Sequence, residues 1–267
     1  MRRSLKGYLY ETHLHTCQGS ACGVSEGKEY PVFYQDMGYD GIFVTDHFFQ
    51  GNCAAPRTGP WEARVDAYMR GYFDALEAGE KIGFKVFFGI EQNYEGDEYL
   101  LYGLDRAFLL AHPDIESWPR TRLFHEVRAY GGCAVQAHPF RDRGYIRRLH
   151  LQLSGVDGVE AVNTANHPWE DACGLRYTRH LGLPATCGSD VHNLETMTPG
   201  RLGGVRLEEE MLSGRDYAAY IRARKPVEPV YCASRLDGNP PRMPEKPYAA
   251  YDGENEIQNF DLESILF

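Results

Sequence analysis

The sequence contains no apolar run approaching the roughly 20 residues that a membrane span requires. The segment Met1–Lys6 also lacks the apolar core of a signal peptide. The 7 cysteines are scattered, and no two of them form a CxxC pair. An odd, dispersed set does not suit a disulfide framework and favours reduced thiols in a cytoplasm. We therefore expect a cytoplasmic protein that does not contact a membrane.

Acidic residues outnumber basic ones, so the formal net charge is −10 at pH 7. This charge disfavours tight, non-specific binding to long nucleic acids, so we expect no stable nucleic-acid complex. A small anionic substrate remains compatible with it, because bound divalent cations reverse the local field. The GxSxG, P-loop and GxGxxG motifs are also missing, so nothing indicates the chemistries that depend on them.

Length and composition suit one large α/β domain. The chain has 267 residues, of which 43% are hydrophobic and 25% charged, enough to bury a sizeable core. Strand-like and helix-like segments alternate, which is typical of a parallel α/β architecture. We expect strands over residues 8–13, 41–45, 85–90, 99–104, 133–136, 158–162, 185–187, 203–207 and 227–231. We expect helices near residues 31–37, 62–82, 105–111, 120–130, 170–180 and 214–224.

About seven of these strands are expected to face one way, which favours a barrel or partly open barrel over a flat doubly wound sheet. We expect the barrel to occupy residues 1–234. The stretch Asp237–Pro247 is rich in Pro, Gly and Asn and predicts a loop that leads to an acidic tail. We expect residues 235–267 to pack on the same domain.

Imidazole and carboxylate side chains gather at the ends of predicted strands. Three of the motifs directly follow the apolar runs Gly41–Thr45, Lys85–Ile90 and Cys133–Ala137. The full set is His13-Leu14-His15, Asp46-His47, Glu91, Ala137-His138-Pro139 and Ser189-Asp190-Val191-His192. Such side chains bind Zn, Mn or Fe, and one carboxylate can bridge two ions. Because the ends of parallel strands meet at one rim of a barrel, the set predicts a multinuclear metal site and an enzyme.

As an ordered set, these motifs resemble the PHP (polymerase and histidinol phosphatase) family of metal-dependent phosphoesterases. The matching segments are Glu11–Thr16, Thr45–His47, Gly89–Glu91, Ala137–Pro139 and Gly188–His192, and the resemblance covers roughly residues 7–231. It implies a distorted (β/α)7 barrel with two or three Zn, Mn or Fe ions at the C-terminal ends of the strands. It also implies hydrolysis of a phosphate ester.

The resemblance further implies roles for individual residues. One ion would be held by His13, His15, Glu91 and Asp190. Glu91 would bridge this ion to a second one, which is also held by His138. His47 and His192 would hold a third ion, or the substrate phosphate where only two ions bind.

Two positions depart from the family pattern. Members often carry a histidine on the strand after the bridging glutamate, and here Glu98 stands at that position, with His112 as the alternative. A carboxylate there would favour a harder ion such as Mn²⁺. Many members also have a further His or Asp after the HxH motif, whereas here the loop Cys17–Cys22 offers no clear replacement.

A phosphate group also needs donors other than metal ions. Arg141 and Arg143 follow His138 in a loop on the predicted rim, and guanidinium groups bind phosphate through two parallel hydrogen bonds. We expect Arg141 to contact the phosphate in preference to Arg143. His167 follows another strand end and is a further candidate for a substrate contact.

Together these features predict hydrolysis of the phosphomonoester of a small metabolite or nucleotide by a metal-activated hydroxide. His192 or His47 would donate a proton to the leaving group. Two alternatives remain, an exonuclease-like phosphodiesterase and a non-catalytic, metal-binding regulatory domain. The sequence does not specify the substrate, the metal or the oligomeric state.

Overall fold

A computed structural model describes residues 6–267, so most of the Met1–Lys6 segment lies outside the described residues. Nine strands form one mixed sheet in the order β10-β9-β1-β2-β3-β4-β5-β7-β8. The sheet nearly closes into a barrel, because Val191 just after β8 pairs with Leu14 at the end of β1. The strands are β1 (Tyr8–Leu14), β2 (Gly41–Val44), β3 (Lys85–Tyr94), β4 (Asp97–Tyr102), β5 (Cys133–Ala137), β7 (Gly158–Asn163), β8 (Ala185–Gly188), β9 (Gly204–Leu207) and β10 (Val227–Val230).

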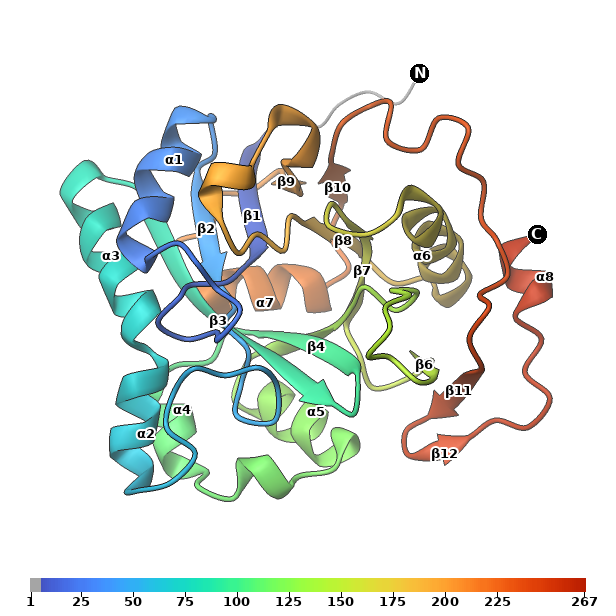
Figure 1. Cartoon of the computed structure of the whole chain (residues 1–267), viewed down its shortest axis with the longest axis horizontal. Helices are drawn as coiled ribbons and strands as arrows, with labels where there is room; N and C mark the ends of the chain where they lie inside the picture. The colour runs from blue at the N-terminus through green and yellow to red at the C-terminus, as the bar shows by residue number, and fades with distance from the viewer. Residues whose placement is uncertain (1–5) are drawn as a thin grey trace.

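Most helices lie around the outside of this sheet, whereas α7 (Gly214–Arg222) lies across its centre in the view of Figure 1. The others are α1 (Tyr30–Asp36), α2 (Trp61–Tyr68), α3 (Arg70–Ile82), α4 (Arg106–Ala111), α5 (Arg120–Ala129), α6 (Pro168–Leu181) and α8 (Glu263–Leu266). The expected barrel-like α/β fold is therefore confirmed. The expected helix over 62–82 is divided at Met69 into α2 and α3. Among the described residues, no helix is long and apolar enough to cross a membrane.

Two strands run against the common direction of the sheet. β4 pairs antiparallel with β3 and β5, and β9 pairs antiparallel with β1 and β10. The alternation of strand and helix is therefore interrupted, and the (β/α)7 count stays a prediction. The reversal at β4 results from a two-residue turn at Glu95-Gly96, where φ is 54° and 110°. Positive φ at both positions is the geometry that joins adjacent antiparallel strands in a tight hairpin.

The reversal of β4 decides where its first residues lie. Because β4 runs opposite to β3 and β5, its beginning lies at the rim where those two strands end. Glu98, the second residue of β4, pairs with Asn93 near the end of β3 and with Ala137 at the end of β5. The carboxylate of Glu98 is thereby brought to the same rim as the ligands that follow the parallel strands.

Aromatic packing closes the barrel at the opposite rim. α7 contacts β3, β4 and β5. The ring of Tyr217 on α7 packs against Phe43 and Tyr102, with centroids 4.7 and 4.9 Å apart. All three rings are fully buried and belong to one apolar cluster. One end of the barrel is thus filled with side chains, which leaves the end near Glu98 for polar groups.

A second, three-stranded sheet lies beside the barrel. It consists of β6 (Leu149–Gln152), β11 (Tyr248–Asp252) and β12 (Asn255–Glu256), and it was not anticipated from the sequence. Leu262, Ile265 and Leu266 near the C-terminus share an apolar cluster with Tyr177 of α6. The C-terminal segment therefore contains regular structure and buried residues. The boundary at residue 234 stays a prediction.

Candidate metal centre

Eight imidazole and carboxylate side chains converge at the rim where the parallel strands end. They form four overlapping groups, and within each group the ligand atoms lie within 4.8 Å of one another. The eight residues are His13, His15, His47, Glu91, Glu98, His138, Asp190 and His192. These are the eight positions that the sequence nominated as metal ligands, and their role in binding stays a prediction.

The HxH motif directs two imidazoles to one point. The Nε2 atoms of His13 and His15 are only 3.1 Å apart. Asp190 Oδ1 lies 3.0 Å from His15 Nε2 and 3.6 Å from His13 Nε2. Three donor atoms that face one another at such distances are suitably arranged to hold one cation.

Glu91 occupies the middle of the cluster. Its Oε1 lies 3.2 Å from His13 Nε2 and 3.1 Å from His138 Nε2. Its Oε2 lies 2.6 Å from His47 Nδ1 and 3.4 Å from His15 Nε2. Each oxygen thus faces a different pair of imidazoles, as expected for a carboxylate that bridges two ions. Burial opposes ionisation of this carboxyl, but the neighbouring His47 and His13 hold its pKa well below the usual range.

Two atoms of this cluster indicate that a cation fits. His47 Nδ1 and Glu91 Oε2 are both buried and lie 2.6 Å apart, and neither makes a well-directed hydrogen bond among the described residues. Buried polar atoms are almost always satisfied, so unpaired atoms of this kind need an explanation such as an ion. A divalent cation accepts lone pairs from both a nitrogen and a carboxylate oxygen. The donor set therefore fits a divalent metal.

Glu98 completes the cluster on the side of β4. Its Oε2 lies 3.5 Å from His138 Nε2, and its Oε1 accepts a hydrogen bond of 2.9 Å from Asn93. His112, the alternative from the sequence, lies elsewhere and packs against the rings of Phe108 and Trp118. The geometry therefore favours Glu98 over His112.

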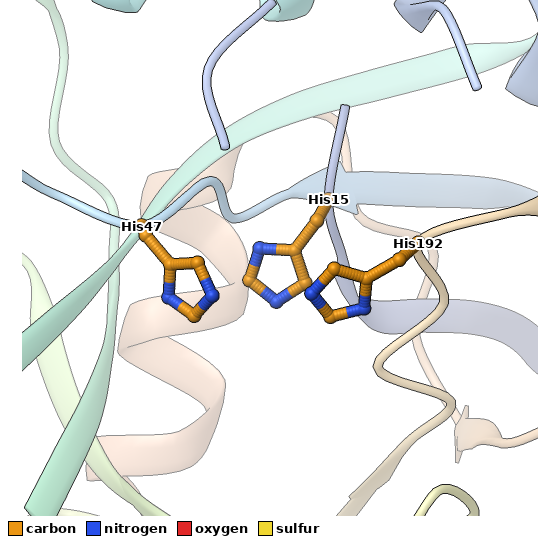
Figure 2. A group of neighbouring side chains, drawn as sticks. All are labelled: His15, His47 and His192. Atoms are coloured by element: carbon orange, nitrogen blue, oxygen red, sulfur yellow. The ribbon is translucent and has the colours of Figure 1, made fainter. Parts of the chain in front are cut away.

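A row of three imidazoles extends from this cluster toward solvent. His15 lies between His47 and His192, with ring centroids 4.3 and 4.2 Å away (Figure 2). The side chain of His192 is 30% exposed, whereas that of His15 is fully buried. The exposed residue Cys22 lines the same cavity as the outer two rings, those of His47 and His192. Burial raises the pKa of the Cys22 thiol, but the neighbouring His192 and His47 outweigh burial and lower it to about 6.

Buried polar partners hold the ligands in place, and of these the sequence had marked only Asp46. Glu160 Oε1 lies 2.8 Å from His13 Nδ1, so the other ring nitrogen faces the cluster. Ser20 lies 3.1 Å from His15 Nδ1 and donates to Asp46. Asp46 also accepts hydrogen bonds from the backbone and hydroxyl of Thr16. Carboxylates that orient metal-binding histidines are a regular part of such sites.

A signal for one of these partners was present in the sequence. Glu160 is the only charged residue within the otherwise apolar and buried strand β7. A buried carboxylate in a strand interior requires a partner, so this position could have been marked as functional. Asp46 belongs to the Asp46-His47 motif that the sequence marked, but its hydrogen bonds with Ser20 and Thr16 were not anticipated. Ser20 gave no comparable signal, because it stands in a polar loop.

The backbone at two of the ligands is held in an uncommon conformation. His138 has φ of 29° and Asp190 has φ of 53°. Positive φ is uncommon for residues other than glycine, and such strained residues cluster at functional sites.

The three residues nominated as phosphate contacts differ in their surroundings. Arg141 is buried and donates to Asp190 Oδ2 at 2.6 Å and to Asn166 Oδ1 at 2.9 Å. Arg143 is half-buried and is held by Glu170 at 2.9 Å, away from the cluster. His167 is exposed at the start of α6. Only Arg141 is linked directly to one of the eight ligands.

A cavity of about 450 Å³ opens in front of the imidazoles. Its size falls in the range of small-molecule sites. The lining residues are Cys22, His47, Gln50, Gly51, Asn52, Asn93, Glu98, Arg141, Tyr145, Asp190 and His192. The cavity therefore gives a small molecule access to four of the eight ligands, His47, Glu98, Asp190 and His192, and to Arg141.

Comparison with solved structures identifies the fold. A two-domain protein from Bacteroides vulgatus that contains a predicted PHP-like metal-dependent phosphoesterase matches 86% of this chain and 69% of its own, with a TM-score of 0.56. This chain shares that fold. The protein PsfC from Pseudomonas syringae matches 87% of this chain and 94% of its own, with a TM-score of 0.52.

The sequence identities to these two proteins are only 14% and 15%, so both structural similarities show the fold alone. No protein-family model matches the chain, and no curated protein is detectably similar to it in sequence. The PHP-like fold expected from the motifs is therefore confirmed, and any activity has to be argued from the site itself.

Proposed function

We propose that this chain is a metal-dependent phosphoesterase that hydrolyses the phosphomonoester of a small metabolite or nucleotide. The observation that carries the proposal is the convergence of eight ligand side chains from separate segments at one rim of the barrel. The cavity beside them has a volume suited to a small substrate. All seven cysteines are free thiols, which supports action in a cytoplasm.

We propose two or three ions, with Zn, Mn and Fe as candidates. His13, His15 and Asp190 would hold the first, and Glu91 would bridge it to a second ion held by His138. Glu98 would complete the second position. When bound, such ions polarise the phosphoryl group and lower the pKa of a water molecule, which supplies a hydroxide nucleophile.

Arg141 has two tasks in this proposal. Its hydrogen bond to Asp190 orients that carboxylate, and its buried guanidinium lines the cavity. A buried positive charge beside the cavity offsets negative charge that develops on the phosphoryl oxygens. Arg143 and His167 stay candidates for contacts to the rest of the substrate.

His47 and His192 also line the cavity and have two possible uses. They can bind a third ion, or they can contact the phosphate and protonate the leaving oxygen where only two ions bind. An imidazole suits the second use, because its ordinary pKa lies near neutral pH. The number of ions held by the protein distinguishes these uses.

The test compares Zn²⁺- and Mn²⁺-loaded protein on phosphomonoesters of metabolites and nucleotides, on a phosphodiester, and on a single-stranded oligonucleotide. Release of inorganic phosphate from monoesters, lost in Glu91→Gln, supports the proposal. Cleavage of the diester alone, or stepwise shortening of the oligonucleotide, favours an exonuclease-like phosphodiesterase. Stoichiometric metal binding without turnover favours a regulatory domain.

A further inference from the structure

The C-terminal segment brings one nearly buried arginine to the outside of α6. The chain runs along α6 after β10 and before β11, and the thiol of Cys173 on α6 donates to the carbonyl of Arg242 in this segment (Figure 1). The side chain of Arg235, earlier in the same segment, is only 9% exposed. Arginine is seldom buried to this extent unless it is paired, so its partners indicate what it holds together.

The guanidinium group of Arg235 joins α6 to the turn that follows β7. Its Nε donates to Asp171 Oδ2 at 2.6 Å, and Asp171 lies fully buried on α6. Its Nη2 donates to two backbone carbonyls, that of Asn163 at 2.9 Å and that of Asn166 at 2.8 Å. Arg235 therefore contacts both ends of the turn formed by residues 163–166.

Asp171 fastens the same turn from the other side. Its Oδ1 accepts hydrogen bonds from the backbone N of Asn163 at 3.1 Å and from Nδ2 of Asn166 at 3.2 Å. Burial raises the pKa of Asp171 to about 6, and the neighbouring charge of Arg235 opposes this rise. Arg235 and Asp171 thus form an ion pair that is bonded to the turn at four points.

The side chains of this turn point toward the metal centre. Asn166 Oδ1 accepts a hydrogen bond of 2.9 Å from Arg141 Nε. Asn163 Nδ2 donates to Glu160 Oε2 at 2.9 Å and lies 3.4 Å from Asp190 Oδ2. The two amides therefore contact the arginine that lines the cavity, one of the eight nominated ligands and the carboxylate that orients another.

We propose that Arg235 is a positioning residue of the metal centre, which holds the turn 163–166 so that its amides orient Arg141 and Asp190. The proposal rests on the function proposed above. Arg235 is not among the described residues that line the cavity, so it acts through the turn and not on the substrate. Such an effect can be large, because a displacement of about 1 Å in a catalytic group costs up to roughly 100-fold in rate.

The informative variant is Arg235→Lys. It keeps a positive charge for Asp171, but an ammonium group is a point charge and cannot reproduce the planar set of donors that reaches both carbonyls. Arg235→Ala is less informative, because it leaves a buried carboxylate without a cation and weakens the fold itself. The matched control is Arg128→Lys, since Arg128 Nη2 also donates to an aspartate, Asp157, and to a backbone carbonyl, that of Gly155, near the start of β7 and away from the cluster.

The first measurement is the affinity for Zn²⁺, by competition with a chromophoric chelator. We expect Arg235→Lys to weaken it by about 10-fold, at the lower end of the range for groups that orient metal ligands. At matched metal loading, kcat/KM for p-nitrophenyl phosphate is expected to fall by about 10- to 100-fold. Arg128→Lys is expected to change both quantities by less than about twofold, and circular dichroism establishes that each variant is folded.

The second measurement combines Arg235→Lys with Asn166→Ala. If Arg235 acts through the turn, the double variant loses no more Zn²⁺ affinity than the more affected single variant. Additive losses, or wild-type affinity in Arg235→Lys, overturn the proposal and leave Arg235 a role in the fold alone. Wild-type protein that binds Zn²⁺ but hydrolyses no monoester overturns the proposed function, and the affinities still decide the role of Arg235. Wild-type protein that binds no metal overturns both.

Discussion

His13 Nδ1 lies 2.8 Å from Oε1 of Glu160, and both side chains are fully buried. This contact fixes which ring nitrogen of His13 faces the other ligands. Glu160 is itself held by a hydrogen bond from Asn163, so a network that begins on β7 orients a ligand on β1. Such carboxylate partners raise the basicity of the imidazole and are nearly as important as the ligand.

We therefore expect Glu160→Gln to weaken metal binding by about 10- to 100-fold, because the amide can keep the hydrogen bond but not the charge. Competition with a chromophoric chelator measures the affinity. The control is Glu170→Gln, which removes another buried carboxylate, on α6, that contacts Arg143 and not the cluster. Unchanged affinity in Glu160→Gln would show that the contact only supports the fold.

The two glutamates at the centre are expected to differ in their effects. Glu91 faces four imidazoles, whereas Glu98 lies at 3.5 Å or more from its two neighbours His138 and His47. Glu91→Gln should lose at least one ion per chain and most of the turnover, because two cations without a shared carboxylate repel each other at short range. Glu98→Gln should lose less metal and less turnover than Glu91→Gln. Elemental analysis and kcat measure the difference, and full metal content in Glu91→Gln would contradict a bridging role.

Much of the fold could be predicted because the pattern of apolar runs is local. The apolar runs Lys85–Ile90 and Cys133–Ala137 directly precede the ligands Glu91 and His138, and they were recognised as strands, β3 and β5. The reversed direction of β4 was missed, because the turn Glu95-Gly96 is not one of the common hairpin dipeptides. The small sheet of β6, β11 and β12 joins segments about 100 residues apart, and no local pattern encodes such a pairing.

The candidate site also has a part that could be predicted from the sequence and a part that could not. Seven of the eight nominated ligands could be found because they stand at or near the ends of predicted strands, where the fold itself brings side chains together. The eighth, Glu98, was nominated only by its position in the family pattern. Glu160 could not be paired with His13, because this contact joins residues that are 147 positions apart in the sequence. The hydrogen bond between Arg141 and Asp190 could not be predicted for the same reason, because the two residues are 49 positions apart in the sequence.

Arg141 is expected to affect both catalysis and metal binding. Arg141→Ala should lower kcat/KM for phosphomonoesters by about 30- to 1,000-fold, corresponding to roughly 2–4 kcal/mol for a charge-assisted contact. The substitution should also weaken binding of the first ion, because Asp190 loses the guanidinium group that orients it. Arg141→Lys should recover only part of the activity, since an ammonium group cannot form two parallel hydrogen bonds.

Steady-state kinetics of the Arg141 variants at matched metal loading tests the expected loss of activity, with Arg143→Ala as the control. Arg143 is engaged by Glu170 and by the carbonyl of Ala165, so its loss should cost less than that of Arg141. A change below about threefold in Arg141→Ala, within the roughly 0.5 kcal/mol of ordinary surface sites, would exclude a role for this residue.

Glu11 provides a test of pH dependence that does not require turnover. Its carboxylate accepts hydrogen bonds from the backbone of His13 at 2.9 Å and of Ser189 at 3.0 Å, and from the hydroxyl of Tyr34 at 2.9 Å. It thereby joins the ends of β1 and β8 beneath the cluster. Burial outweighs these bonds and raises the pKa of Glu11 from 4.5 to about 7.

A raised pKa means that the folded protein binds the proton of Glu11 more tightly than the unfolded chain does. The corresponding stability is fully present below pH 4.5 and is lost as the pH rises from 4.5 to about 7. Glu11→Gln stays neutral and keeps a carbonyl oxygen for the two backbone donors. Relative to wild type, it should therefore gain up to about 3 kcal/mol in the free energy of unfolding across this window. Urea unfolding of metal-free protein at several pH values measures the gain, and the exposed substitution Glu245→Gln should not produce it. A difference between Glu11→Gln and wild type that is the same at pH 4.5 and pH 7 would show that Glu11 does not titrate in this range.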